Sequence, residues 1–140
     1  MAVKRVPPAS GYSGTRLIDK LGIKPQTRVQ FVSEPPNFTA LLGKLPTGCQ
    51  VAPRGELDFA ILFVTTRADL EKRFDRLRDR LKSNGMLWIS WPKKTSGVPS
   101  DLTENTVREI GLANGLVDVK VCAIDETWSG LKFVRRLKDR

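Results

Sequence analysis

The strongest constraint in this sequence is an uninterrupted apolar segment, Phe59-Ala-Ile-Leu-Phe-Val64. A run that carries no polar residue over this length is typical of a strand buried on both faces of a parallel sheet. Thr66 and Asp69 follow as a capping box, which predicts a helix that begins directly after the strand. A second buried strand is predicted at residues 86–91. The buried face of the intervening helix is expected to hold Leu70, Phe74, Leu77 and Leu81.

The same alternation of helix and strand patterns extends over most of the chain. It gives way at the C-terminus to two consecutive strand patterns, which a polar loop at residues 125–130 joins as a hairpin. Alternation predicts a parallel sheet with helices on both faces. We therefore predict an α/β fold, with a doubly wound, mostly parallel sheet that ends in a C-terminal antiparallel hairpin. The other expected strands lie at residues 28–33, 49–52, 117–124 and 131–137, and the other helices begin at Ser13-Gly14-Thr15, at Asn37 and at the capping box of Asp101 and Glu104.

A chain of 140 residues has the length of one domain. We expect a basic, flexible N-terminus at residues 1–12 and a single α/β domain at 13–140. No apolar run approaches the roughly 20 residues that span a bilayer, and the N-terminus lacks the features of a secretion signal. These patterns predict a cytoplasmic protein without a membrane partner. Cys49 and Cys122 lack metal-ligand spacing, and the chain has no histidine, so no metal site and no histidine-based catalytic triad are expected.

The formal net charge of +9 lies mostly at the two ends of the chain. Residues 1–24 contain five basic residues and one acidic residue, and residues 131–140 have the same balance. The segment between them is almost neutral, with 14 basic and 13 acidic residues. Cationic ends attract nucleic acid through the release of counterions, but they also occur as tails that keep a protein in solution. Nucleic acid is therefore one candidate partner.

The pattern resembles the class I methyltransferase variety of the Rossmann fold, in a truncated form. Leu81-Lys-Ser-Asn-Gly-Met-Leu-Trp-Ile resembles the turn before the fifth strand of that superfamily, and the terminal hairpin resembles its sixth and seventh strands. The superfamily places a glycine-rich turn after its first strand, where this chain has Ser33-Glu-Pro-Pro-Asn37. Proline fixes φ and removes an amide donor, so we expect no ordinary S-adenosylmethionine (SAM) site and predict no cofactor.

Three longer blocks resemble an uncharacterised bacterial family, a domain of unknown function. The first runs from Tyr12 to Ile23, the second is Trp91-Pro-Lys-Lys-Thr-Ser-Gly97, and the third runs from Cys122 to Leu131. The blocks are distributed over nearly the whole chain. The resemblance implies no particular reaction.

In an open α/β sheet, ligands bind beyond the carboxyl ends of the strands. The segment Lys93-Lys94-Thr95-Ser96-Gly97 follows a predicted strand and offers two ammonium groups and two hydroxyl groups. With the helix that begins near Thr103, it predicts a site for a phosphate or carboxylate, although a solvated loop between two prolines explains it equally well. Tyr12, Ser13 and Thr15 are expected at the same edge of the sheet.

Asp125, Glu126 and Trp128 form a second candidate group at this edge, in the predicted hairpin loop. Asp125 and Glu126 could orient a ribose or serve as a base, and Trp128 could stack on a ring. Alternatively, Asp125 accepts backbone amides in a turn and Trp128 packs on the loop. Trp88 and Trp91 are three residues apart and must point to opposite faces of their strand. We expect Trp88 in the core and Trp91 at the site.

These features favour a binding module for an anionic small molecule or a protein partner. A divergent transferase or methyltransferase, with Lys93, Asp125 and Glu126 as working groups, is the enzymatic alternative, since a carboxylate whose pKa is raised can act as a base. A nucleic-acid-binding protein that uses its basic termini is the third hypothesis.

Overall fold

The computed structural model describes residues 16–140, so the predicted helix start at residues 13–15 lies outside the described part. The helices are α1 (Leu17–Leu21), α2 (Phe38–Leu42), α3 (Arg67–Arg80) and α4 (Glu104–Ala113). The strands are β1 (Arg28–Val32), β2 (Gln50–Val51), β3 (Leu57–Phe63), β4 (Leu81–Pro92), β5 (Leu116–Ala123) and β6 (Trp128–Arg135). Two short 3-10 turns, η1 (Lys94–Ser96) and η2 (Leu137–Asp139), follow β4 and β6. Within residues 16–140, no helix has the length and apolar character needed to cross a membrane.

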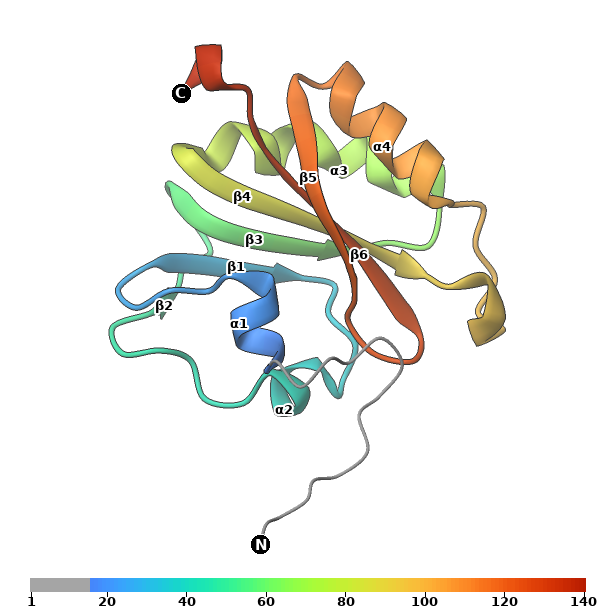
Figure 1. Cartoon of the computed structure of the whole chain (residues 1–140), viewed down its shortest axis with the longest axis horizontal. Coiled ribbons are helices and arrows are strands. Elements are labelled where there is room, and N and C mark those ends of the chain that lie inside the picture. Colours follow the sequence, from blue (N-terminus) through green and yellow to red (C-terminus); the bar gives the residue numbers. More distant parts are fainter. Residues whose placement is uncertain (1–15) are drawn as a thin grey trace, which may run out of the picture.

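The six strands form one mixed sheet in the order β2-β1-β3-β4-β6-β5. The neighbouring pairs among β1, β2, β3 and β4 are parallel, whereas β6 is antiparallel to both β4 and β5 (Figure 1). The predicted fold class is therefore confirmed: the sheet is mostly parallel and its C-terminal strands form an antiparallel hairpin. Because β5 follows the direction of β4, the carboxyl ends of β1, β3, β4 and β5 all lie at the same edge of the sheet.

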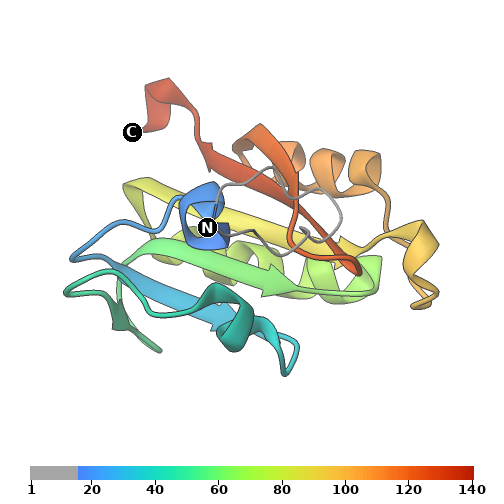
Figure 2. The same cartoon turned by 60° about the horizontal axis from the view of Figure 1, so that its bottom comes forward.

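Helices cover both faces of the sheet, as the apolar run that begins at Phe59 of β3 requires. Phe59, Ile61 and Phe63 of β3 belong to the core cluster that includes α1 and α2. Ala60 and Leu62 belong to the cluster on the other face, with α3 and α4. Figure 2 shows α1 in front of the sheet and α3 and α4 behind it. The alternation of side chains along a strand thus divides one apolar segment between two separate cores.

Trp88 fixes α1 to the middle of the sheet. Its side chain is fully buried, and its indole N–H donates a 2.9 Å hydrogen bond to the carbonyl oxygen of Leu21, the last residue of α1. Gly22 ends the helix with a φ of 85°, a conformation that favours glycine. Gly130 lies against the Trp88 ring, since a Cβ at this position would be 3.1 Å from the ring carbon Cε3. The prediction that Trp88 belongs to the core is confirmed.

The helix caps differ in part from the sequence-based prediction. Thr66 caps α3 as predicted, and its hydroxyl accepts the amide of Asp69. The predicted capping box of Asp101 and Glu104 is wrong. Because α4 begins at Glu104, its N-cap is Thr103, which accepts the amide of Thr106. Asn37 is the N-cap residue of α2 as predicted, but its side chain makes no capping hydrogen bond.

The strands at the C-terminal side are placed differently from the prediction. β4 pairs with β3 from Leu81 onward, through a register irregularity, so that it begins five residues before the predicted strand. β6 begins at Trp128 rather than at Leu131, because residues 128–130 pair with the end of β4. It ends at Arg135, and Leu137 lies beyond it in η2 with 80% of its surface exposed.

Gly111 permits the close approach of α4 to the sheet. A Cβ at this position would lie 2.0 Å from Cε1 of Phe133, a fully buried ring that also packs edge-on against Phe74. We expect Gly111→Ala to destabilise the protein by about 1–3 kcal/mol, although alanine is the better helix former. Thermal unfolding should show a melting temperature several degrees lower. Glu109→Ala, at an exposed position of the same helix, is the matched control and should leave the melting temperature nearly unchanged.

Candidate anion-binding site

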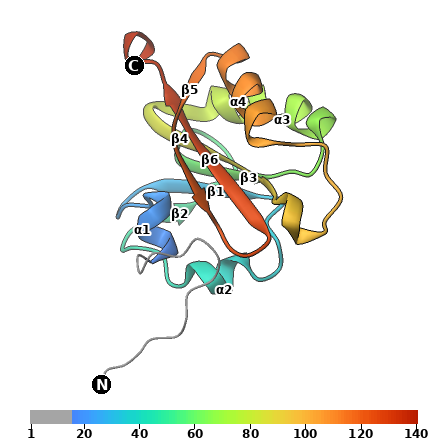
Figure 3. The same cartoon turned by 45° about the vertical axis from the view of Figure 1, so that its right-hand side comes forward.

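Two predicted groups of site residues meet at the carboxyl edge of the sheet. The amide of Lys93, directly after β4, donates a 2.8 Å hydrogen bond to the carbonyl oxygen of Thr127, in the turn between β5 and β6. Figure 3 shows η1, which follows β4, beside the tip of this hairpin. From η1 the chain continues to α4. The contact joins the lysine-containing loop to the Asp125–Trp128 turn, as the topology predicts.

A pocket of about 370 Å³ lies between this loop and the beginning of α4. Two ammonium side chains and one carboxylate are among the residues that line it. Lys93 is half-buried, whereas Lys94 and Asp101 are exposed. The lining residues that carry the argument are Lys93, Lys94, Gly97, Asp101, Leu102 and Thr103.

The loop that carries the lysines is held in shape by its own hydrogen bonds. The hydroxyl of Ser96 donates to the carbonyl oxygen of Lys93 at 2.7 Å and accepts the amide of Val98 at 3.1 Å. Gly97 has a φ of 80°, which favours glycine at this turn. Thr95 and Ser96 do not line the pocket, so of the five residues predicted here the structure brings Lys93, Lys94 and Gly97 to it.

The far side of the pocket is tied to two helix N-termini. One carboxylate oxygen of Asp101 accepts the amide of Arg67, the first residue of α3, at 2.7 Å. The hydroxyl of Ser100 donates to the carbonyl oxygen of Thr65 at 2.7 Å. With Thr103 as the cap of α4, this segment links the beginnings of both helices. The carboxylate of Asp101 therefore lies at the N-terminus of α3, where the positive end of the helix dipole stabilises a negative charge.

Asp125 and Trp128 have structural partners in the hairpin turn. One carboxylate oxygen of Asp125 accepts the amides of Thr127 and Trp128, each at 2.8 Å. The half-buried Trp128 packs edge-on against Phe63, with the ring centroids 5.2 Å apart. These contacts match the alternative interpretation of the sequence, in which Asp125 accepts backbone amides in a turn and Trp128 packs on the loop. Glu126 is exposed beside them.

The remaining predicted site residues divide into two groups. Trp91 is only 5% exposed and packs in the core on the α3 and α4 side, with Ile89 and Leu102. The expectation that it reaches the site is therefore corrected: β4 continues to Pro92, and alternation turns Trp91 into the core. Tyr12, Ser13 and Thr15 lie outside the described residues.

The turn after β1 contains an interaction that the sequence analysis missed. Ser33 has a φ of 58°, an uncommon conformation for a residue with a side chain. Its hydroxyl accepts a 2.9 Å hydrogen bond from the guanidinium of Arg73, and Arg73 also forms a 2.6 Å ion pair with Asp69. The spacing of Asp69 and Arg73 indicates their pairing in α3, but no local pattern connects Arg73 to Ser33, forty residues away.

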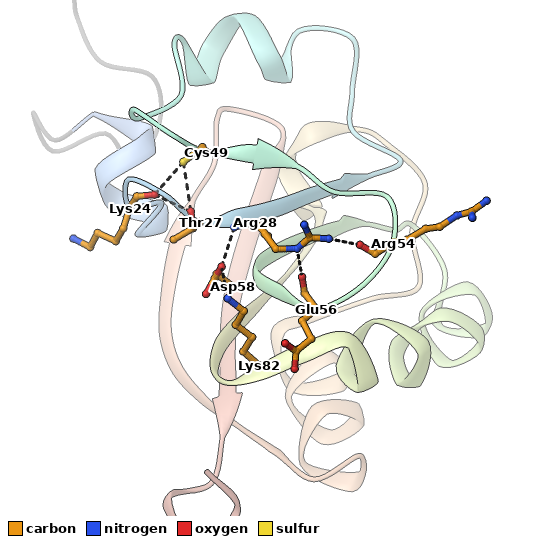
Figure 4. A network of polar contacts seen from close by, with 8 residues as sticks. All are labelled: Lys24, Thr27, Arg28, Cys49, Arg54, Glu56, Asp58 and Lys82. Carbon is orange, nitrogen blue, oxygen red and sulfur yellow. Dashed lines mark hydrogen bonds and ion pairs between the residues drawn. The ribbon is translucent and has the colours of Figure 1, made fainter.

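The opposite edge of the sheet holds a separate polar network, drawn in Figure 4. Asp58 accepts the amide of Arg28 at 2.8 Å and pairs with Lys82 at 3.3 Å, while the Arg28 guanidinium donates to the backbone carbonyls of Glu56 and Arg54. These contacts join β1, β3 and β4 where the strands begin. The network therefore has a structural role.

The two cysteines lie apart in the fold, and both are free. Cys49 donates to the carbonyl oxygen of Lys24 at 3.0 Å. Burial raises the pKa of the Cys122 thiol, which disfavours the reactive thiolate. Among residues 16–140, no group of three or more potential metal-binding side chains occurs.

Comparison with solved structures shows a methyltransferase fold. A SAM-dependent methyltransferase from Aquifex aeolicus superposes with a TM-score of 0.59 at 14% identity, over 84% of this chain and 86% of that one. Magnesium protoporphyrin IX methyltransferase from Synechocystis PCC 6803, with bound SAM, gives a TM-score of 0.55 at 12% identity, over 86% and 74% of the two chains. At these identities the likeness establishes the fold alone. No family model and no curated protein matches the sequence, so membership of the bacterial family of unknown function stays a prediction.

The role of Asp125 can be measured through stability. Asp125→Ala would leave the amides of Thr127 and Trp128 without their shared acceptor, which we expect to cost about 1–3 kcal/mol. The melting temperature should fall by several degrees. The matched control is Glu126→Ala, which removes the exposed neighbouring carboxylate. Equal melting temperatures for the two variants would contradict the structural role.

Proposed function

We propose that this methyltransferase-like chain is a binding protein that holds an anionic small molecule, such as a phosphate or carboxylate compound, at the carboxyl edge of its sheet. The observation that carries the proposal is the 370 Å³ pocket lined by Lys93 and Lys94. Ammonium groups attract anions, and a pocket of this volume falls within the range of small-molecule sites.

The shape of the loop supports this proposal. The amide of Lys93 is bound to Thr127, its carbonyl oxygen is bound to Ser96, and Asp101 holds the far end of the segment at α3. A loop that is already ordered loses little conformational entropy when a ligand binds. Because Asp101 also lines the pocket, we expect ligands that place their anionic group near the lysines and a hydrogen-bond donor near this carboxylate.

The turn after β1 argues against SAM as the ligand. A SAM site of the methyltransferase type needs backbone that can approach the cofactor closely, which glycine provides. Here the turn has two prolines, the amide of Phe38 is bound to the carbonyl oxygen of Pro35, and the Ser33 hydroxyl is occupied by Arg73. These residues do not fit the cofactor. We therefore propose no methyl transfer through SAM.

The enzymatic alternative has less support from the geometry. A transferase that uses Lys93 with Asp125 and Glu126 would need one of these two carboxylates at the pocket to serve as a base. Asp101, the carboxylate that does line the pocket, is bound to the amide of Arg67. Asp125 is held by two backbone amides, and neither it nor Glu126 lines the pocket. A protein partner at this edge of the sheet is a further possible outcome of the experiment below.

The proposal is tested by thermal unfolding with inorganic pyrophosphate, adenosine monophosphate, citrate and SAM. A ligand present at 100 times its dissociation constant adds about 2.7 kcal/mol, which corresponds to roughly 10 °C for a domain of this size. We expect one of the anionic compounds to raise the melting temperature of the native chain, and Lys93→Ala with Lys94→Ala to abolish that shift. Lys44→Ala with Lys72→Ala removes the same charge at exposed positions elsewhere and is the matched control.

Two results would contradict the proposal. One is an anion-induced shift that persists in the Lys93 and Lys94 variant, because the anion would then bind elsewhere. The other is a shift of similar size with SAM alone, which would favour the enzymatic alternative. Absence of any shift would direct the search to a protein partner.

A further inference from the structure

Four lysines from distant parts of the sequence gather on the face of the sheet that carries α1. Lys20 lies in α1, Lys24 follows it, Lys120 lies in β5 and Lys132 lies in β6. The ammonium group of Lys20 donates to the carbonyl oxygen of Ala123 at 3.0 Å, and that of Lys120 donates to the carbonyl oxygen of Lys20 at 2.9 Å. We call these four residues the lysine face. Figure 3 shows the β5–β6 hairpin facing forward, with α1 beside it.

The lysine face joins the two basic ends of the sequence. Lys20 and Lys24 belong to the basic segment 1–24, and Lys132 belongs to the basic segment 131–140. In the sequence they are separated by a segment that is nearly neutral. The fold therefore places three lysines from the two basic ends on one surface, together with Lys120 from the nearly neutral segment.

This concentration of charge is unfavourable for the folded chain alone. Lys120 and Lys132 are directly opposite in the β5–β6 register, and like charges at such positions destabilise a sheet. Partial burial, together with the charges of Lys120 and Lys24, lowers the pKa of Lys132. A lowered lysine pKa means that the charged form of this side chain is less stable in the folded chain than in the unfolded one.

The acidic residues of α1 and β5 are paired with arginines and not with the lysine face. Asp19 of α1 pairs with Arg16 at 3.0 Å, and Asp118 of β5 pairs with Arg108 at 2.9 Å. Within residues 16–140, no salt bridge includes Lys24, Lys120 or Lys132. An anion from outside the chain would therefore relieve repulsion that the described part of the chain leaves in place.

We infer that the lysine face binds the phosphate backbone of a duplex nucleic acid without reading its sequence. Several amines on a sheet surface match a series of phosphates, and their binding releases counterions. Unpaired bases would need exposed aromatic rings for stacking, and the large exposed apolar residues among residues 16–140 are all aliphatic. Insertion into a membrane surface would need a larger area of apolar side chains beside the lysines. Of the two exposed valines of β5, Val121 pairs with Leu131 and so lies on the opposite face of the hairpin, and Val119 lies at the register irregularity before Lys120, so at most one of them accompanies the lysines.

The inference is tested by fluorescence anisotropy of a labelled 20-base-pair DNA duplex at 50–200 mM salt. If four lysines each neutralise one phosphate, a plot of log affinity against log salt has a slope of about −3.6. Lys24→Gln with Lys132→Gln removes two of these contacts. We expect its slope to be smaller by about 1.8 and its affinity at 0.1 M salt to fall about 60-fold.

The matched control is Lys72→Gln with Arg76→Gln. Both residues are exposed on α3, which covers the opposite face of the sheet, and the variant has the same net charge as the test variant. It should retain the native slope. Equal losses in the two variants would overturn the inference, because net charge would then explain binding. Tighter binding to phosphatidylserine vesicles, or to a single strand of the same length, would overturn it as well.

A second measurement uses the repulsion within the lysine face and needs no ligand. Lys132→Met keeps the length of the side-chain stem and removes its charge. Because it relieves the opposition to Lys120, the melting temperature should rise by about 1–3 °C in the absence of nucleic acid. This variant should also bind the duplex less tightly than the native chain. If the variant were more stable but bound the duplex as tightly as the native chain, Lys132 would contribute to the repulsion and not to binding. That result would contradict the inference.

Discussion

The hydrogen bond from the Trp88 indole to the carbonyl oxygen of Leu21 holds together the half of the structure that faces α1. A helix of five residues has no stability of its own and depends on tertiary contacts. Trp88 provides them by covering the end of α1 inside the core, while Lys120 satisfies the neighbouring carbonyl oxygen of Lys20. The positions of Lys20 and Lys24 relative to β5 and β6 follow from this anchor.

The sequence predicts well those features that depend on periodicity. The cap at Thr66 and the opposite orientations of Trp88 and Trp91 follow from local patterns, and the structure confirms them. The strand predicted at residues 59–64 is also present, with the bounds Leu57–Phe63. The sequence also places the lysines at 93 and 94 beside the hairpin turn, because parallel strands share one carboxyl edge.

The errors arise where a partner is distant in the sequence. Asp101 has the spacing of a capping residue for the helix that follows it, yet its carboxylate accepts the amide of Arg67, the first residue of α3, thirty-four residues earlier. Trp91 stands at the end of a predicted strand, but pairing with Ser129 and Trp128 extends β4 beyond it and keeps the ring inside. The contact between Arg73 and Ser33 likewise depends on how α3 packs beside β1. Local propensity contains no information on such pairings.

The anchoring of α1 also determines when the lysine face can exist. The two groups that bind the end of this helix are 67 and 100 residues away from it in the sequence. Contacts across such separations form late, since the intervening chain must first lose its freedom. During synthesis, Lys20 and Lys24 leave the ribosome before Lys120 and Lys132 have been made. The four charges therefore come together only after β5 and β6 have joined the sheet, so that a partially folded chain lacks the surface that its finished form presents.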